Sequence, residues 1–218
     1  MFLLSRAIFL LLALVLVLGQ AAPARSPDTL AGRLRLAVFN DAGVSPDTMA
    51  HAASRATFVL AQSGIELDWI NCGHPDPSDF SPHLTLCSAL AWPHQLSVRI
   101  LPRGRSIHSD VFGQAFLDES GSGVYCNVYY NNLAANRAHT PLTDADMLGL
   151  VIAHEVGHLL LGANSHSESG LMQAHWDASA LQVAAHHNLF FTPAQSATLR
   201  MRLADAPPLY ALARRPLS

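Results

Sequence analysis

The sequence predicts an α+β domain in which a mixed, twisted β-sheet is covered by helices. Segments typical of strands fill the first two-thirds of the chain, and one helix separates the first two of them. An almost wholly apolar helix follows the strands, and such a helix belongs in the interior of a domain. Of the 218 residues 50% are hydrophobic and 13% are charged, so the chain can bury a core and is too apolar for a disordered protein. A mixed sheet with helical cover suits this order of elements.

The first 24 residues have the pattern of a secretory signal peptide. Arg6 precedes an apolar run over residues 7–18, and small residues follow as far as Ala24. The run is shorter than the roughly 20 apolar residues that span a bilayer. We therefore expect export, secreted or periplasmic, with cleavage after Ala21 or Ala24 and no stable membrane insertion afterwards. Residues 25–32 would then form a short leader.

The chain that remains after cleavage is long enough for one domain, which is expected over residues 33–218. The sequence has 13 Lys+Arg against 16 Asp+Glu, a formal net charge of −3. It therefore lacks the basic field that holds nucleic acid. Every basic residue is an arginine, which excludes Schiff-base catalysis by lysine. The sequence does not predict an oligomeric state.

Strand-like patterns recur before the central helix. The predicted strands are Leu34–Asn40, Ile65–Ile70, Leu96–Leu101, Val111–Leu117 and Gly123–Tyr130. A helix begins between the first two, where Ser45 can cap it, Pro46 suits the first helical position and Asp47 is an acid in the first turn. Its apolar spacing ends at Gly64.

The central helix is predicted from its caps and its apolar length. Thr143 and Asp144 mark its start, residues 147–161 are almost wholly apolar, and Gly162 ends it. An irregular segment follows, and a last helix is expected over residues 192–204, beginning at a Thr-Pro pair.

Three cysteines give an odd thiol count in an exported chain. Cys72 and Cys87 flank a segment rich in Pro, Asp, Ser and His, within a loop predicted over residues 71–94. We predict that these two form a disulfide that staples the loop. Cys126 lies in a strand-like run, where a buried thiol acts as a small hydrophobic side chain.

The central helix contains the sequence His154-Glu155-Val156-Gly157-His158, the HExxH pattern. Residues four apart lie on one face of a helix, so the two imidazoles can bind one ion together. Zinc brings the pKa of a bound water to about 7, and the adjacent Glu155 can accept its proton during attack on a substrate. Two histidines and a glutamate buried without a metal would cost several kcal/mol unless each found a partner.

A catalytic zinc needs a third protein ligand and an open position. The candidates downstream are His166, His175, Asp177 and Asp205. Glu168 is the last glutamate in the sequence, so no later glutamate can serve. His166 is preferred, because the break at Gly162 lets the chain turn back toward the helix.

The run from His154 to Ser167 resembles the metzincin zinc metalloproteases, the matrixins in particular. The shared features are Gly157 between the histidines, the helix-ending Gly162, the third histidine His166 and the serine after it. Met172, in Ser169-Gly170-Leu171-Met172, resembles the Met-turn that supports the metal site of that clan. The sequence differs from the family in spacing: glycine follows the second histidine by four residues instead of three, and the third histidine follows by four more.

The resemblance implies a zincin fold with one zinc held by His154, His158 and His166. It also implies hydrolysis of peptide bonds with Glu155 as general base, and an upper part of the domain to about residue 162 followed by a lower part over 163–218. The expected partner is a peptide or protein substrate, held as an added strand at the sheet edge by Gly123–Tyr130 or by Val111–Leu117. Two other functions stay open: a metal-stabilised secreted binding module without turnover, and a zinc amidase acting on cell-wall peptides.

Overall fold

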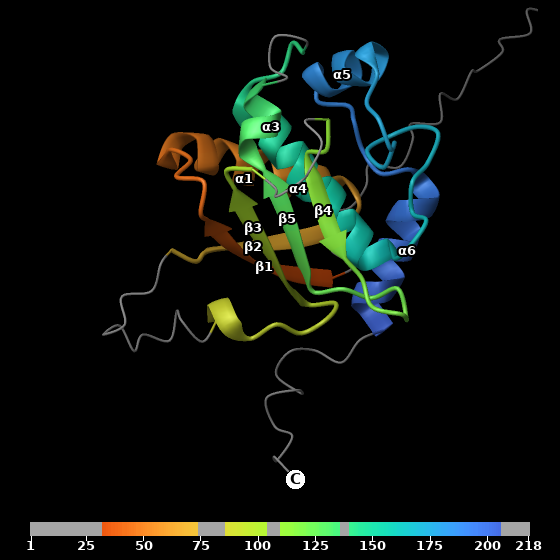
Figure 1. Cartoon of the computed structure of the whole chain (residues 1–218). Helices are drawn as coiled ribbons and strands as arrows, with labels where there is room; N and C mark the ends of the chain where they lie inside the picture. The colour runs from red at the N-terminus through yellow and green to blue at the C-terminus, as the bar shows by residue number, and fades with distance from the viewer. Residues whose placement is uncertain (1–31, 74–85, 104–109, 136–139, 206–218) are drawn as a thin grey trace, which may run out of the picture.

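The computed structural model describes residues 32–73, 86–103, 110–135 and 140–205 (Figure 1). The predicted signal peptide and nearly all of the predicted leader lie outside these residues. Within the described ranges, no helix has the length and apolar character needed to cross a membrane.

The sheet has five strands and is mixed, as predicted. Its strands are β1 (Gly32–Asn40), β2 (Ile65–Asn71), β3 (Gln95–Leu101), β4 (Gly113–Phe116) and β5 (Tyr125–Tyr129). They lie in the order β2-β1-β3-β5-β4, and every neighbouring pair is parallel except β4 and β5, which are antiparallel. The short strand β4 is therefore at one edge of the sheet.

Five helices accompany the sheet in the described chain. They are α1 (Pro46–Gln62), α3 (Tyr130–Ala135), α4 (Asp144–Leu161), α5 (Ala178–Ala185) and α6 (Pro193–Asp205). The predicted Gly123–Tyr130 strand ends one residue early, because Tyr130 begins α3. The sequence did not locate α3 or α5, and residues 86–88 form a helical turn inside the segment predicted as loop.

The main core lies between the sheet and the pair α1 and α4, which pack against each other (Figure 1). Alternate strand residues such as Leu34, Leu36 and Val98 point into it, as the period of two in a strand requires. Helix α4 is central: 13 of its 18 residues are buried. Its start is the predicted one, since Thr143 and Asp146 form a capping box.

Cys72 and Cys87 form a disulfide, and Cys126 is a buried free thiol, in agreement with the sequence-based pairing. The disulfide joins the end of β2 to the helical turn at residues 86–88 and packs with Ala37 and Ile70 in a small second cluster. The two cysteines are 15 residues apart in the sequence, so the bond closes a short loop.

Removing the disulfide should destabilise the fold measurably. Closing a loop of this length lowers the entropy of the unfolded chain and contributes about 3 kcal/mol. We expect the Cys72→Ser/Cys87→Ser double variant to lose about that much free energy of unfolding in a urea titration. Reduced wild type should behave like the variant. Peptide mapping that joined Cys126 to either partner would contradict the pairing.

Candidate metal centre

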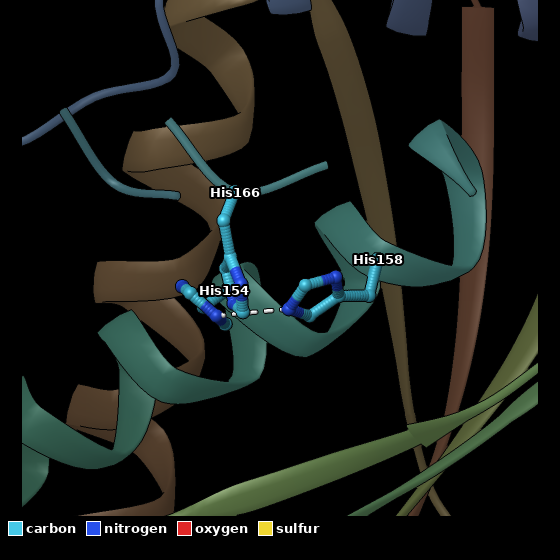
Figure 2. A group of neighbouring side chains, drawn as sticks. All are labelled: His154, His158 and His166. Carbon is cyan, nitrogen blue, oxygen red and sulfur yellow. Dashed lines mark hydrogen bonds between the residues drawn. The ribbon is translucent and has the colours of Figure 1, made fainter. Parts of the chain in front are cut away.

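His154 and His158 lie one turn apart on α4 and face the same space. Their Nε2 atoms are 3.1 Å apart, and the two ring centroids are separated by 4.8 Å (Figure 2). Both positions are half-buried, so the rings are held by the surrounding protein. The pair arises directly from the spacing of four residues in a helix.

His166 reaches the pair from the segment that follows α4. Gly162 ends the helix with φ of 93°, a conformation that favours glycine, and its N–H donates to the His158 carbonyl. The chain then turns back, and the His166 ring lies 4.7 Å from that of His158 and 5.6 Å from that of His154. Figure 2 shows His166 pointing at the two helical histidines. One potential ligand atom from each of the three residues lies within 4.8 Å of the others.

Hydrogen bonds to the Nδ1 atoms orient both helical rings. His154 Nδ1 lies 2.8 Å from the Leu171 carbonyl oxygen, and His158 Nδ1 lies 2.8 Å from Ser165 Oγ. Because a carbonyl only accepts, the His154 proton is on Nδ1, and its Nε2 lone pair is directed at the neighbouring imidazoles. An outer partner of this kind fixes the tautomer that a metal ligand needs.

Burial keeps the two helical imidazoles neutral. It lowers the pKa of His154 to about 4, against a smaller opposing effect of the bond to the Leu171 carbonyl. It lowers the pKa of His158 to about 3, and His154 and His166 add to the shift. Neutral imidazole is the form that binds metal ions.

Glu155 is buried between α4 and the edge strand β4. Its side chain faces Gly113, where an added Cβ would lie 2.4 Å from Oε1. Burial raises the pKa of Glu155 to about 8, and a hydrogen bond from the Ala115 backbone partly opposes the rise. A divalent cation beside the carboxyl would lower that pKa again, because opposite charge favours the ionised form.

The three histidines fit a tetrahedral zinc ion. Ligand nitrogens at 2.0–2.1 Å from such an ion are about 3.3 Å apart, close to the 3.1 Å between the Nε2 atoms of His154 and His158. The third imidazole completes the protein ligand set of a catalytic site, and the adjoining cleft leaves the fourth position open.

Two of the other candidates for the third ligand, His175 and Asp177, do not converge on the helical pair. His175 lines the same cleft but does not belong to the group of converging ligand atoms. Asp177 caps α5, where its Oδ1 accepts a hydrogen bond from the Ala180 N–H at 2.8 Å. The side chain of Asp205 lies outside the described part of the structure.

Met172 packs against α4 at Gly157, which lies between the two histidines in the sequence. It is fully buried, and a Cβ added at Gly157 would lie 2.6 Å from its sulfur. Glycine at this position lets the Met172 side chain approach the helix closely, and the turn that carries Met172 is closed by a 2.9 Å bond from Ser167 N–H to the Met172 carbonyl. The likeness of this turn to the Met-turn stays a prediction.

A cleft of about 620 Å³ runs along the site. Strand β4 forms one wall, and the segment around Trp176 lines the cleft with the three histidines and Glu155. Of the two segments predicted to hold substrate, only the one containing β4 lies at a sheet edge. Strand β5 pairs on both sides, with β3 and with β4.

Sequence reasoning missed the groups that support the ligands. The Leu171 carbonyl, which also accepts from Trp176 Nε1 at 3.0 Å, and the hydroxyl of Ser165 carried no pattern of their own. Gln195 carried one signal: it lies three residues after Thr192, as in a capping box.

No protein-family model matches the chain, and no curated protein matches it. Solved structures do. A zinc-dependent peptidase from Methanocorpusculum labreanum is 16% identical, with a TM-score of 0.51 over 75% of this chain and 99% of that chain. The chain has the fold of a zinc-dependent peptidase.

Two further matches have TM-scores of 0.49. Archaemetzincin from Methanopyrus kandleri is 14% identical and covers 84% of this chain and 99% of its own. Metalloproteinase-II from Bacteroides fragilis is 17% identical and covers 81% of this chain and 54% of its own. None of the three is described as a matrixin, so the specific likeness to the matrixins stays a prediction.

Proposed function

We propose that this protein is an exported zinc-dependent endopeptidase with a metzincin-like active site. The observation that carries the proposal is the convergence of three imidazoles beside a buried glutamate, in a cleft bounded by an edge strand. In the proposed site His154, His158 and His166 hold one zinc ion, and Glu155 is the general base.

Each group of the proposed site has a separate role in peptide hydrolysis. Zinc, when bound, supplies a Lewis acid that polarises the scissile carbonyl and makes water acidic. Glu155 accepts the proton of the attacking water and passes it to the leaving amine, and the hydrogen bond from the Ala115 backbone holds the carboxylate. The Leu171 carbonyl and Ser165 keep two imidazoles in the ligating orientation.

The free edge of strand β4 is the observation that favours a polypeptide as the substrate. The strand is antiparallel to β5 on one side and is the last strand of the sheet on the other. An extended peptide can therefore add to this edge through main-chain hydrogen bonds. Such pairing would place a peptide bond in the cleft next to Glu155, whose carboxyl lies against Gly113 of the same strand.

The disulfide supports export. Disulfides persist in oxidising compartments and are rare in the cytosol. The Cys72–Cys87 disulfide and the signal-peptide pattern in the first 24 residues are therefore two independent features that favour export.

Metal content and proteolysis should be coupled. The purified mature chain is expected to carry about one zinc per molecule and to cleave casein, because three imidazoles form a complete catalytic ligand set. Elemental analysis and casein digestion, each with and without a chelator, measure both properties. Digestion should stop with the chelator and return with added zinc.

The alternatives give different results in the same assay. A chain that binds zinc but leaves casein intact would be a binding module or an amidase, and cell-wall peptides would then separate these two. A chain that takes up no zinc at neutral pH would contradict the whole assignment.

A further inference from the structure

A single side chain of α6 joins that helix to the segment carrying the third histidine. Gln195 Nε2 donates to the Ser165 carbonyl at 3.1 Å and to Ser167 Oγ at 3.2 Å. These two acceptors are the residues on either side of His166. The side chain therefore holds the segment immediately before and after the proposed ligand.

The orientation of the Gln195 amide is fixed by the start of α6. The amide oxygen Oε1 accepts a 3.0 Å hydrogen bond from the Thr192 backbone N–H. The Gln195 backbone N–H donates to Thr192 Oγ1 at 3.3 Å, and the two bonds together form a capping box. A backbone N–H can only donate, so the amide oxygen must face Thr192. The amide nitrogen must then face the His166 segment.

The same segment also supports the second ligand and the Met172 turn. Ser165 contacts His158 Nδ1 through its hydroxyl, while its carbonyl accepts from Gln195. Ser167 accepts from Gln195, donates its hydroxyl to the Ser169 carbonyl at 2.8 Å and donates its N–H to the Met172 carbonyl. A shift of this segment would therefore move His166 and the partner of His158 together.

His166 needs such support more than the other two histidines. It is exposed, whereas His154 and His158 are half-buried on a rigid helix. Three residues separate Gly162 from His166, one more than in the resembling family, and a longer connection has more conformations to lose on closure.

We propose that Gln195 is a positioning residue of the metal centre, which fixes His166 directly and His158 through Ser165. This inference rests on the proposed zinc site. It assigns to the first turn of α6 a role in metal affinity, beyond its role in starting a helix. Outer partners of metal ligands typically contribute 10- to 100-fold in affinity.

The variant Gln195→Glu separates the two roles. Glutamate has the same shape and is equally suited to the capping box, and its charge is favourable at a helix N-terminus. It cannot donate to the Ser165 carbonyl, and it places a carboxylate oxygen against that carbonyl instead. We expect the metal-free protein to stay folded with a melting temperature slightly below that of wild type, because the two hydrogen bonds from the amide are lost. We expect the zinc affinity to fall about 10- to 100-fold.

Zinc affinity is measured by competition with a chelating dye, and the coordination by the visible spectrum of bound Co²⁺. Four-coordinate Co²⁺ absorbs more strongly than six-coordinate Co²⁺, so a loosened His166 should weaken the spectrum of the variant. Gln182→Glu, at an exposed position on α5, makes the same change of charge away from the site and should match wild type.

Each outcome decides the inference. Wild type that binds no zinc or Co²⁺ would overturn the proposed site itself. Wild-type binding together with equal affinity in Gln195→Glu would leave the proposed function standing and overturn the role of Gln195. A loss of affinity with a Co²⁺ spectrum identical to that of wild type would show that the coordination does not depend on Gln195 and would also overturn it. If Gln195→Glu does not fold, Gln195→Met decides: it keeps the length of the side chain and removes both bonds to the His166 segment without adding a charge, and unchanged affinity in it would contradict the inference.

Discussion

Replacing Glu155 with glutamine should abolish peptide hydrolysis while zinc content stays at the wild-type level. The substitution removes the group that accepts the proton of the attacking water, a contribution of about 10²–10⁴ in rate. It removes none of the three imidazoles that converge beside it. The amide fits the space against Gly113 and can still accept the hydrogen bond from the Ala115 backbone.

The measurement pairs turnover of an internally quenched peptide with elemental analysis of the same preparation. The stability of the metal-free protein should not fall, because a carboxyl group with a pKa of about 8 is already mostly neutral at pH 7 and the amide has nearly the same size. Glu168→Gln is the matched control: it makes the same change at an exposed residue after His166 and should keep full activity. Wild-type turnover in Glu155→Gln would refute the general-base role, and loss of zinc would assign Glu155 to metal binding instead.

The part of the site that could be predicted lies within one helix. Thr143, Gly162 and the spacing of His154 and His158 are local patterns, and a helix converts them into geometry without help from the rest of the chain. The same holds for α1, where Ser45 accepts from the Thr48 N–H and Pro46 is the first helical residue. Local rules are sufficient where the interactions are local.

The remainder depends on contacts between distant segments. Gln195 and Ser165 are 30 residues apart, and His154 meets a carbonyl 17 residues away, so no short pattern predicts either contact. Sequence patterning also could not decide which strand is the edge. The segments of β4 and β5 have similar strand-like sequence patterns. Strand β4 is outermost because β5 pairs with β3. The short helix α3 was missed because the strand pattern continues into Tyr130.

The choice of the third ligand has the clearest physical basis of the predicted roles. His166 is brought to the helical pair by the turn at Gly162 and by the bonds from Ser165 and Ser167 to other parts of the site. His175 shares the cleft without converging on the pair. His166 and His175 therefore have the same side chain and line the same cleft, but only His166 converges on the position of the proposed ion.

His166→Ala should reduce zinc affinity by more than about 100-fold, since loss of a direct ligand costs more than the 10- to 100-fold typical of an outer partner. Two imidazoles would remain, and water would occupy the released position, which weakens the hold on the ion. His175→Ala should leave the affinity near wild type, because His175 contributes no converging atom. Competition with a chelating dye at neutral pH measures both variants, and the melting temperature of each metal-free protein shows whether it is folded. Comparable losses in the two variants, or a larger loss in His175→Ala, would transfer the third ligand from His166 to His175.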